Sequence, residues 1–479
     1  MNKPTRVALI LAPLAVALAY PAGAWFLGRR VEANFAGQYE KLEQQGVLKV
    51  VSRDYQRGLF DAVETVSFEL APAMKSALLM GMKGAVPGDA PVDPGLRFTV
   101  RSTIQHGPLP GGKTFAAALV HSELVLGAEA QAEVKKVLGD AKPLELVTRY
   151  AFLGGGRSEL SSPAFKTSFR TEKGENVQLA WDGLKAEMEF GAKLRHYTMQ
   201  VNVPRLEASD DKGTRMLVSG LRFSGEGQRL LGEDSQMYSG RSQFDMDEVS
   251  LKLAEQADKT FLLQKLNYSI DMPAKDGFID LSAKMGAEVV KVAAQDYGPV
   301  HYDFSLRHLQ VAAADTLQRK ASELYANPAN MTAAANSRVM LAALQEPMIE
   351  LLKHQPEFRI DRLQFRNQHG EALLTGALKL DGAKPEDFAS PMLLMGKVNM
   401  QADLKLPAAM AVSFMTAGKP AAEEDEAQAA ARTDMALQQV EAFVAQGYLE
   451  RQGELVQARF ALSNGAMTLN DKPFGPGAH

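Results

Sequence analysis

The chain has 479 residues, of which 53 are basic and 57 acidic, so its formal net charge is −4 at pH 7. This balance argues against a general phosphate-binding surface for nucleic acid. The sequence has no cysteine, which excludes disulfides, thiolate metal sites and cysteine nucleophiles. With 46% hydrophobic and 23% charged residues, the composition is that of a folded protein and not of a disordered or collagen-like one.

The chain opens with an uncharged apolar run, Val7–Gly28, which has basic residues on both sides. As a helix it spans about 33 Å, enough for a hydrocarbon core of ~30 Å. We therefore predict a cytoplasmic tail at 1–6 and a single transmembrane anchor at 7–28. A signal peptide cleaved after Ala24 is the alternative, because Ala22-Gly23-Ala24 fits the small-residue cleavage pattern. A buried soluble helix is a third interpretation.

Residues 29–417 show mostly the period-two alternation of antiparallel strands with one buried face. Apolar residues recur at every second position in 177–190, 197–203, 266–272, 300–306, 372–380 and 398–406. Asp182-Gly183 predicts a two-residue hairpin turn, and Asp211-Lys212-Gly213 and Asp276-Gly277 predict further turns. The fold class we predict is α+β, dominated by a long antiparallel meander with a few packed helices.

Helical insertions are predicted near 128–139 and 312–354 by apolar positions at helical spacing. Gly139 closes the first, and Asn327-Pro328 divides the second. Near the C-terminus, 418–433 carries an acidic and alanine-rich run that predicts a solvated linker and a helix start. Residues 434–479 are then predicted to form a helix and a β-hairpin.

Gly107–Thr114 matches the phosphate-loop pattern G-x-x-x-x-G-K-[ST] letter for letter. A phosphate loop aims backbone N–H groups at the phosphates from the start of a helix. Pro110 lacks that N–H group, and the surroundings have the alternation of antiparallel strands. We therefore predict a rigid turn and no nucleotide. The histidines, carboxylates and glycines form no other catalytic, cofactor or metal pattern, so we expect no cofactor and no enzyme, although a site spread over several strands would escape a motif search.

The segment Asp54–Asp61, with its Tyr-x-Arg-Gly-x-Phe pattern, and the turn His106-Gly107-Pro108 carry a family resemblance. Both resemble motifs of the bacterial YdgA-like proteins, a family of unknown function, and 447–449 and 465–474 resemble its closing hairpin. The resemblance implies an inner-membrane anchor, a periplasmic β-rich body and no catalytic residues to transfer. The motif residues that we interpret as structural are Tyr55, Arg57, Gly58, Phe60, His106, Gly107 and Pro108. Physically, Arg57-Gly58 suits a turn that docks the stalk onto the sheet.

Three functions follow from this reading. The first is an envelope protein whose sheet forms an apolar groove for lipid, a hypothesis favoured by analogy with elongated AsmA-type proteins. The second is an envelope interaction scaffold with a closed core, and the third is an enzyme. For one part of the apolar face we predict burial under helices, because large apolar patches are rarely left uncovered. This part comprises Met188, Phe190, Met199, Val201 and Val203.

Overall fold

The computed structural model describes residues 48–70, 97–112, 114–170, 174–233, 235–254, 260–293, 295–326, 336–416 and 426–474, with 24, 26–30, 32–33, 35–37, 39–40 and 43. The predicted tail and nearly all of the predicted anchor lie outside these residues. Among the helices described, none has the length and apolar character needed to cross a membrane. Of the predicted anchor, Ala24 and residues 26–28 are described, and they are helical.

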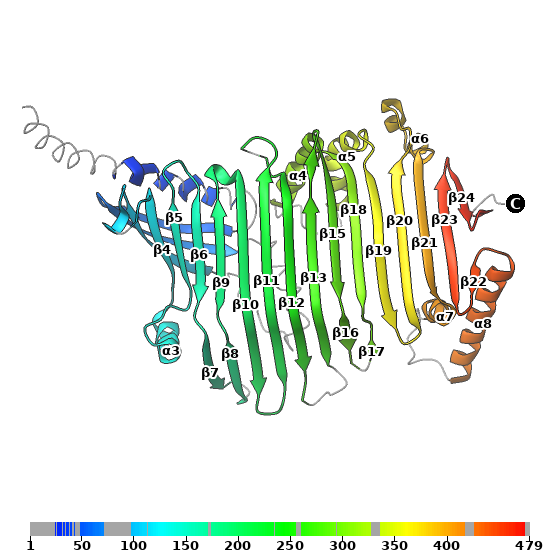
Figure 1. Ribbon diagram of the computed structural model, residues 1–479, viewed down its shortest axis with the longest axis horizontal. Coiled ribbons are helices and arrows are strands. Elements are labelled where there is room, and N and C mark those ends of the chain that lie inside the picture. The colour runs from blue at the N-terminus through cyan, green and yellow to red at the C-terminus, as the bar shows by residue number, and fades with distance from the viewer. Residues whose placement is uncertain are drawn as a thin grey trace, which may run out of the picture.

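One antiparallel sheet runs through the described chain from end to end (Figure 1). Its first strands are β1 Leu48–Arg57, β2 Asp61–Leu70, β3 Arg97–His106, β4 Ala118–Val125, β5 Glu145–Tyr150, β6 Gly156–Ser162, β7 Phe165–Arg170, β8 Asn176–Trp181, β9 Leu184–Phe190, β10 His196–Asp210, β11 Arg215–Arg229, β12 Tyr238–Lys252 and β13 Phe261–Met272. Its later strands are β14 Ala274–Lys275, β15 Phe278–Ala287, β16 Val289–Val292, β17 Gln295–Asp296, β18 Val300–Gln310, β19 Glu357–Asn367, β20 Gly370–Leu380, β21 Val398–Pro407, β22 Glu450–Gln452, β23 Leu455–Ser463, β24 Ala466–Leu469 and β25 Lys472–Pro473. The predicted β-dominated antiparallel fold is confirmed.

The predicted hairpin at Asp182-Gly183 is wrong. Strands β8 and β9 do not pair with each other; both pair with β10, so they run in line along the same neighbour. Gly183 has a φ of 91°, and the backbone N–H of Asp182 donates to the carbonyl of Arg205 at 3.0 Å. The Asp-Gly pair therefore interrupts one edge of a long strand instead of reversing the chain, as a bulge does.

Helices leave the sheet along both of its long edges and at its C-terminal end (Figure 1). They are α3 Ala128–Leu138, α4 Val311–Ala326, α5 Asn336–Leu352, α6 Pro391–Met395, α7 Ala408–Thr416 and α8 Glu426–Ala445, with short 3-10 turns η1 Pro110–Gly112, η2 Ala192–Leu194 and η4 Pro385–Ala389. The predicted insertions coincide with α3 and with the α4–α5 pair. Helix α8 begins inside the predicted linker at 418–433, because alanine and glutamate favour helix there. The C-terminal hairpin is no separate unit, since β23 pairs with β21.

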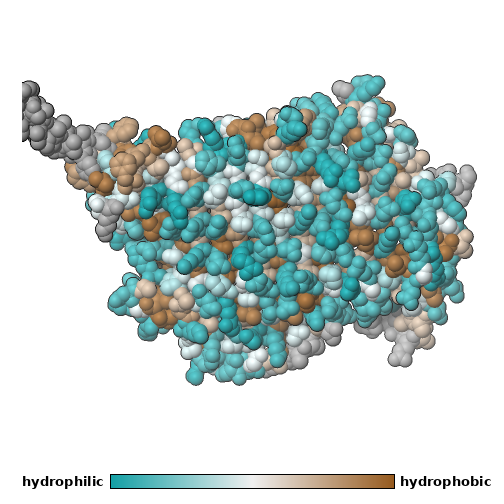
Figure 2. Space-filling view, in the orientation of Figure 1, coloured by the Kyte–Doolittle hydropathy of each residue, from teal (hydrophilic) through white to brown (hydrophobic). Residues whose placement is uncertain are grey.

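Three buried apolar clusters lie on the same face of the sheet. At the N-terminal end, the helical residue Phe35 packs on Ala62, Ile104 and Val120 of the sheet. Midway, residues at the start of α4 pack on β13 and β15. At the C-terminal end, α7 and α8 pack on β20, β21 and β23. The opposite face, turned to the viewer in Figure 2, is largely hydrophilic.

Candidate functional site

Directly paired residues form an unbroken cross-strand row along the apolar face. Paired residues of antiparallel neighbours point to the same face, so their side chains touch in sequence across the sheet. The row consists of Leu146, Leu160, Ala186, Val201, Phe223, Phe244, Tyr268, Met285, Tyr302, Leu363 and Leu374. We call the face along this row the apolar trough.

The middle of the trough is open to solvent as far as the described residues go. No described hydrophobic residue between Val120 and Met237 is fully buried. Met285 is 43% exposed and Tyr302 is 42% exposed. The residues that we predicted to lie under helices, Val201 among them, are only half-buried. That prediction is wrong for the described structure, because the covering helices gather at the two ends and at one rim.

Beyond the trough the row turns polar at its N-terminal end. It continues through Ser122 and Ser102, whose hydroxyls lie 2.8 Å apart, to Glu64. Glu64 is fully buried; it accepts hydrogen bonds from Arg53 Nε at 2.6 Å and from Tyr39 Oη at 2.8 Å. A buried carboxylate that keeps both partners holds its surroundings in one arrangement, because losing Arg53 leaves its charge unpaired and losing Tyr39 removes a hydrogen-bond donor.

The motif residue Tyr55 pairs with Glu64 across β1 and β2. Its hydroxyl is buried and has no hydrogen-bond partner. Burial, reinforced by the charges of Glu32 and Glu64, raises the pKa of Tyr55 to about 12. The same causes, burial first and then Glu64, raise the pKa of Tyr39. Both phenols therefore stay neutral at physiological pH.

His106 connects the N-terminal helix to the hairpin of β1 and β2. It is 1% exposed; its Nδ1 lies 2.9 Å from the carbonyl oxygen of Ala24, and its Nε2 lies 3.1 Å from that of Asp61. Carbonyl oxygens only accept hydrogen bonds. A neutral ring therefore donates to one of the two carbonyls, and a ring protonated on both nitrogens donates to both. Its backbone N–H also donates to the carbonyl of Phe60 at 2.9 Å. Arg57, at the end of β1, forms an ion pair with Glu32 of the same helix at 3.1 Å.

The hairpin turn is defined by Gly58 and Phe60. Gly58 is not in the left-handed region, so φ does not demand glycine there. The constraint is steric, since a Cβ on Gly58 would lie 2.2 Å from Asp61 Oδ1. Phe60 is 42% exposed, so it does not fill a core site. The motif therefore combines a docking contact, made by Arg57 and His106, with an exposed aromatic tip.

The Gly107–Thr114 loop connects two antiparallel strands, β3 and β4. Gly107 has a φ of 123°, its N–H donates to the carbonyl of Ala117, and Pro108 follows it into the 3-10 turn η1. A strand follows the loop where a phosphate loop has a helix. Lys113 lies outside the described residues.

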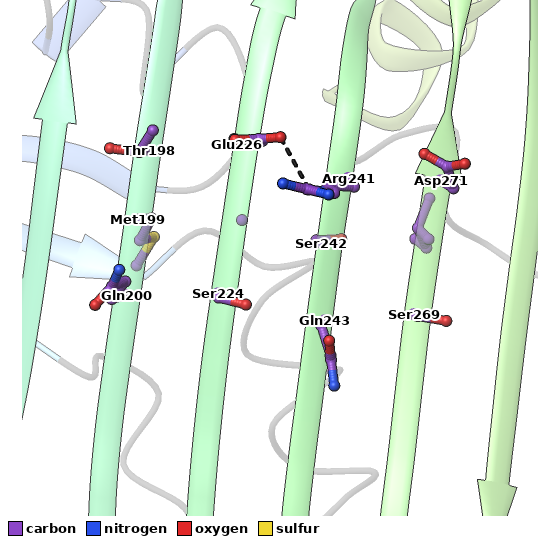
Figure 3. Close-up of a pocket in the computed structure, with 12 residues that line it drawn as sticks. Thr198, Met199, Gln200, Ser224, Glu226, Arg241, Ser242, Gln243, Ser269 and Asp271 are labelled. Carbon is purple, nitrogen blue, oxygen red and sulfur yellow. Dashed lines mark ion pairs between the residues drawn. The ribbon is translucent and has the colours of Figure 1, made fainter.

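A hollow of about 510 Å³ lies over strands β10 to β13, and residues of both faces of the sheet contribute to its lining (Figure 3). Glu226 and Arg241, on neighbouring strands of its lining, form an ion pair at 2.9 Å. The rest of the lining combines polar side chains with Met199, Gly225 and Ile270. Exposed pairs of this type contribute little stability, about 0–1 kcal/mol. Within the described ranges, no group of three or more histidine and acidic side chains is placed to hold a metal ion.

The family model for bacterial proteins of unknown function called DUF945 matches residues 1–476. The chain belongs to this DUF945 family. No curated protein and no solved structure matches the chain. Family membership thus agrees with the motif resemblance at the level of a bacterial family without an assigned activity.

Sequence reasoning identified the motif residues but missed what surrounds them. The spacing of Tyr55 and Arg57 gave no sign that Glu64 and Tyr39 complete the buried cluster. One signal was available: Glu64 occupies an inward position of an otherwise apolar alternation in β2. An acidic residue at such a position requires a buried partner.

Proposed function

We propose that this DUF945 protein is a bacterial inner-membrane protein whose apolar trough, in the periplasm, binds the acyl chains of envelope lipids. The observation that carries the proposal is the continuous row from Leu146 to Leu374, half-buried and bounded by helices at its ends. A hydrocarbon chain lying on this row gains about 25 cal/mol for each Å² of apolar surface removed from water. It needs no hydrogen bonds, and the paired strands below it offer no free backbone groups.

Anchorage by residues 7–28 is part of the same proposal. Ala24 is fully buried and its carbonyl faces His106, so cleavage after Ala24 would remove a contact that the fold uses. The helix that follows packs on the N-terminal end of the sheet through Phe35. The interaction scaffold without a ligand is the alternative, and the open apolar face would then receive a protein segment.

Photo-crosslinking in intact membranes distinguishes lipid binding from the interaction scaffold. A photoreactive phenylalanine analogue at Phe244 faces the trough, and the same analogue at the neighbouring Gln243 faces the polar side, because side chains alternate along a strand. With radiolabelled phospholipid, we expect a lipid adduct at Phe244 and none at Gln243. Protein adducts alone at Phe244 would favour the scaffold and contradict lipid binding.

A charge in the trough provides the functional test. Val201 is half-buried and has no described helix above it, so Val201→Glu should change the unfolding free energy by only about 1 kcal/mol. It should nevertheless abolish the lipid adduct at Phe244. The first matched control is Gln200→Glu on the polar face, which should change neither the unfolding free energy nor the lipid adduct. The second is Val456→Glu, which buries a charge at a 1% exposed site and should unfold the protein. An unchanged adduct in folded Val201→Glu would count against the trough.

A further inference from the structure

Exposed apolar side chains gather where the N-terminal helix meets the sheet. They lie in three turns, β1–β2, β3–β4 and β5–β6, at one edge of the sheet. Leu153 is 91% exposed and Phe115 is 75% exposed. Leu59, Phe60 and Leu109 are also exposed large hydrophobics. In Figure 2, hydrophobic surface is visible at the upper left rim, beside the N-terminal helical residues.

Backbone hydrogen bonds connect the three turns into one rim. The N–H of His106 donates to Phe60, that of Gly107 to Ala117, and that of Ala117 to Tyr150. The rings of Phe115 and Phe152 lie 4.8 Å apart, between the second and third turns. These exposed tips therefore stand on ordered strand ends and not on separate loops. We call residues 58–60, 107–112, 114–117 and 151–155 the apolar rim.

The rim lies beside the point where the predicted membrane segment enters the fold. The carbonyl of Ala24 contacts His106 at the base of the rim, and Gly28 packs against the same imidazole ring. None of the described residues of the rim is acidic. The turn at the opposite edge, Asp211-Lys212-Gly213, is charged. Apolar tips without acidic groups suit the surface of a bilayer that contains anionic lipid.

We propose that the apolar rim inserts into the surface of the bilayer that holds the anchor, and so sets the N-terminal end of the trough at the membrane. The inference rests on the membrane anchorage proposed above, but it does not require that the trough binds lipid. The partner is the phospholipid bilayer itself: tips such as Leu153 and Phe115 project from turns, where they reach the acyl boundary without disturbing the sheet.

The absence of native cysteine allows a direct test. Single variants Leu153→Cys and Phe115→Cys of the full chain are labelled with an environment-sensitive fluorophore and reconstituted into phosphatidylethanolamine–phosphatidylglycerol vesicles. Asp211→Cys, at the tip of the β10–β11 turn on the opposite edge, is the matched control. We expect a blue shift and at least threefold weaker quenching by iodide at the two rim positions, and strong quenching by nitroxide lipids. The control should remain fully open to iodide.

The outcomes separate the two proposals. If the chain floats with vesicles after an alkaline wash but all three probes are quenched by iodide equally, the rim does not insert, and anchorage stands. If the chain does not float, both anchorage and rim insertion are overturned. Protection from iodide without quenching by nitroxide lipid would mean that protein covers the rim, which also overturns insertion. Unfolding is excluded by an unchanged circular dichroism melt of each labelled variant.

Discussion

The two half-buried tyrosines near Glu64 provide a matched pair at the scale of single residues. Tyr39 donates to the buried carboxylate at 2.8 Å, whereas the buried hydroxyl of Tyr55 has no partner. Removing the Tyr39 hydroxyl should cost about 1–3 kcal/mol, because Glu64 then loses one of its two donors. Tyr55→Phe should leave the unfolding free energy unchanged or raise it. Thermal or denaturant unfolding of Tyr39→Phe and Tyr55→Phe measures the difference, and equal losses would contradict the assignment of hydrogen bonds.

The raised pKa of Tyr55 predicts that the stability of the fold depends on alkaline pH. Tyrosine in the unfolded chain has its ordinary pKa of 10.0, and folded Tyr55 has a pKa of about 12. Between these values the folded state keeps a proton that the unfolded state loses, so stability falls as pH rises. Tyr55→Phe should lose less stability than the wild type from pH 10 to pH 12. Tyr39, whose pKa is also raised, remains in both proteins and accounts for the loss that persists. Parallel stability curves would contradict the shift at Tyr55.

At the scale of elements, the docking of the N-terminal helix depends on one close contact. A Cβ on Gly28 would lie 2.7 Å from Cε1 of His106, so Gly28→Ala must displace the helix or the ring. We expect a loss of about 1–3 kcal/mol. Gly37 has nothing within 4 Å, so Gly37→Ala in the same helix should stabilise by ~0.5–1 kcal/mol instead. Unfolding melts of the full chain check both. The cost of Gly28→Ala should shrink in a His106→Ala background, and strict additivity would contradict the contact.

Elements also show where sequence reasoning succeeds and where it fails. Period-two alternation identified the strands because it reflects local burial, and apolar positions at helical spacing placed α3 and the α4–α5 pair for the same reason. Asp182-Gly183 has the composition of a hairpin turn, yet both flanking strands pair with β10, a choice set by long-range partners. Likewise, the inward pattern of Val201 shows which face is apolar, but not whether a helix from elsewhere covers it. The buried cluster at Glu64 needed Tyr39, which only the folded chain brings near.

At the scale of the whole molecule, polar and apolar side chains lie on opposite faces of the sheet, and helices cover the apolar face at its ends. One face carries ion pairs such as Glu226–Arg241, and the other carries the apolar row. Helices cover that row at both ends, so solvent reaches mainly its middle. Eleven strands about 4.8 Å apart give a trough about 48 Å long, well beyond the ~15 Å that one leaflet of a ~30 Å hydrocarbon core provides for an acyl chain. The trough therefore has room for lipids in succession.

A trough of this length, with its β5 end beside the apolar rim, predicts a direction of loading. Lipid that enters from the bilayer at this end reaches Leu160 on β6 before Val201 on β10, and Val201 before Leu363 on β19. In Val201→Glu, photoreactive probes should still give lipid adducts at Leu160 and lose them at Leu363, because a desolvated charge blocks the passage of an acyl chain between the two. Gln200→Glu, on the polar face, should leave both adducts. Equal adducts at Leu363 with and without the charge would mean that lipid enters along the open length of the trough and not from its membrane end.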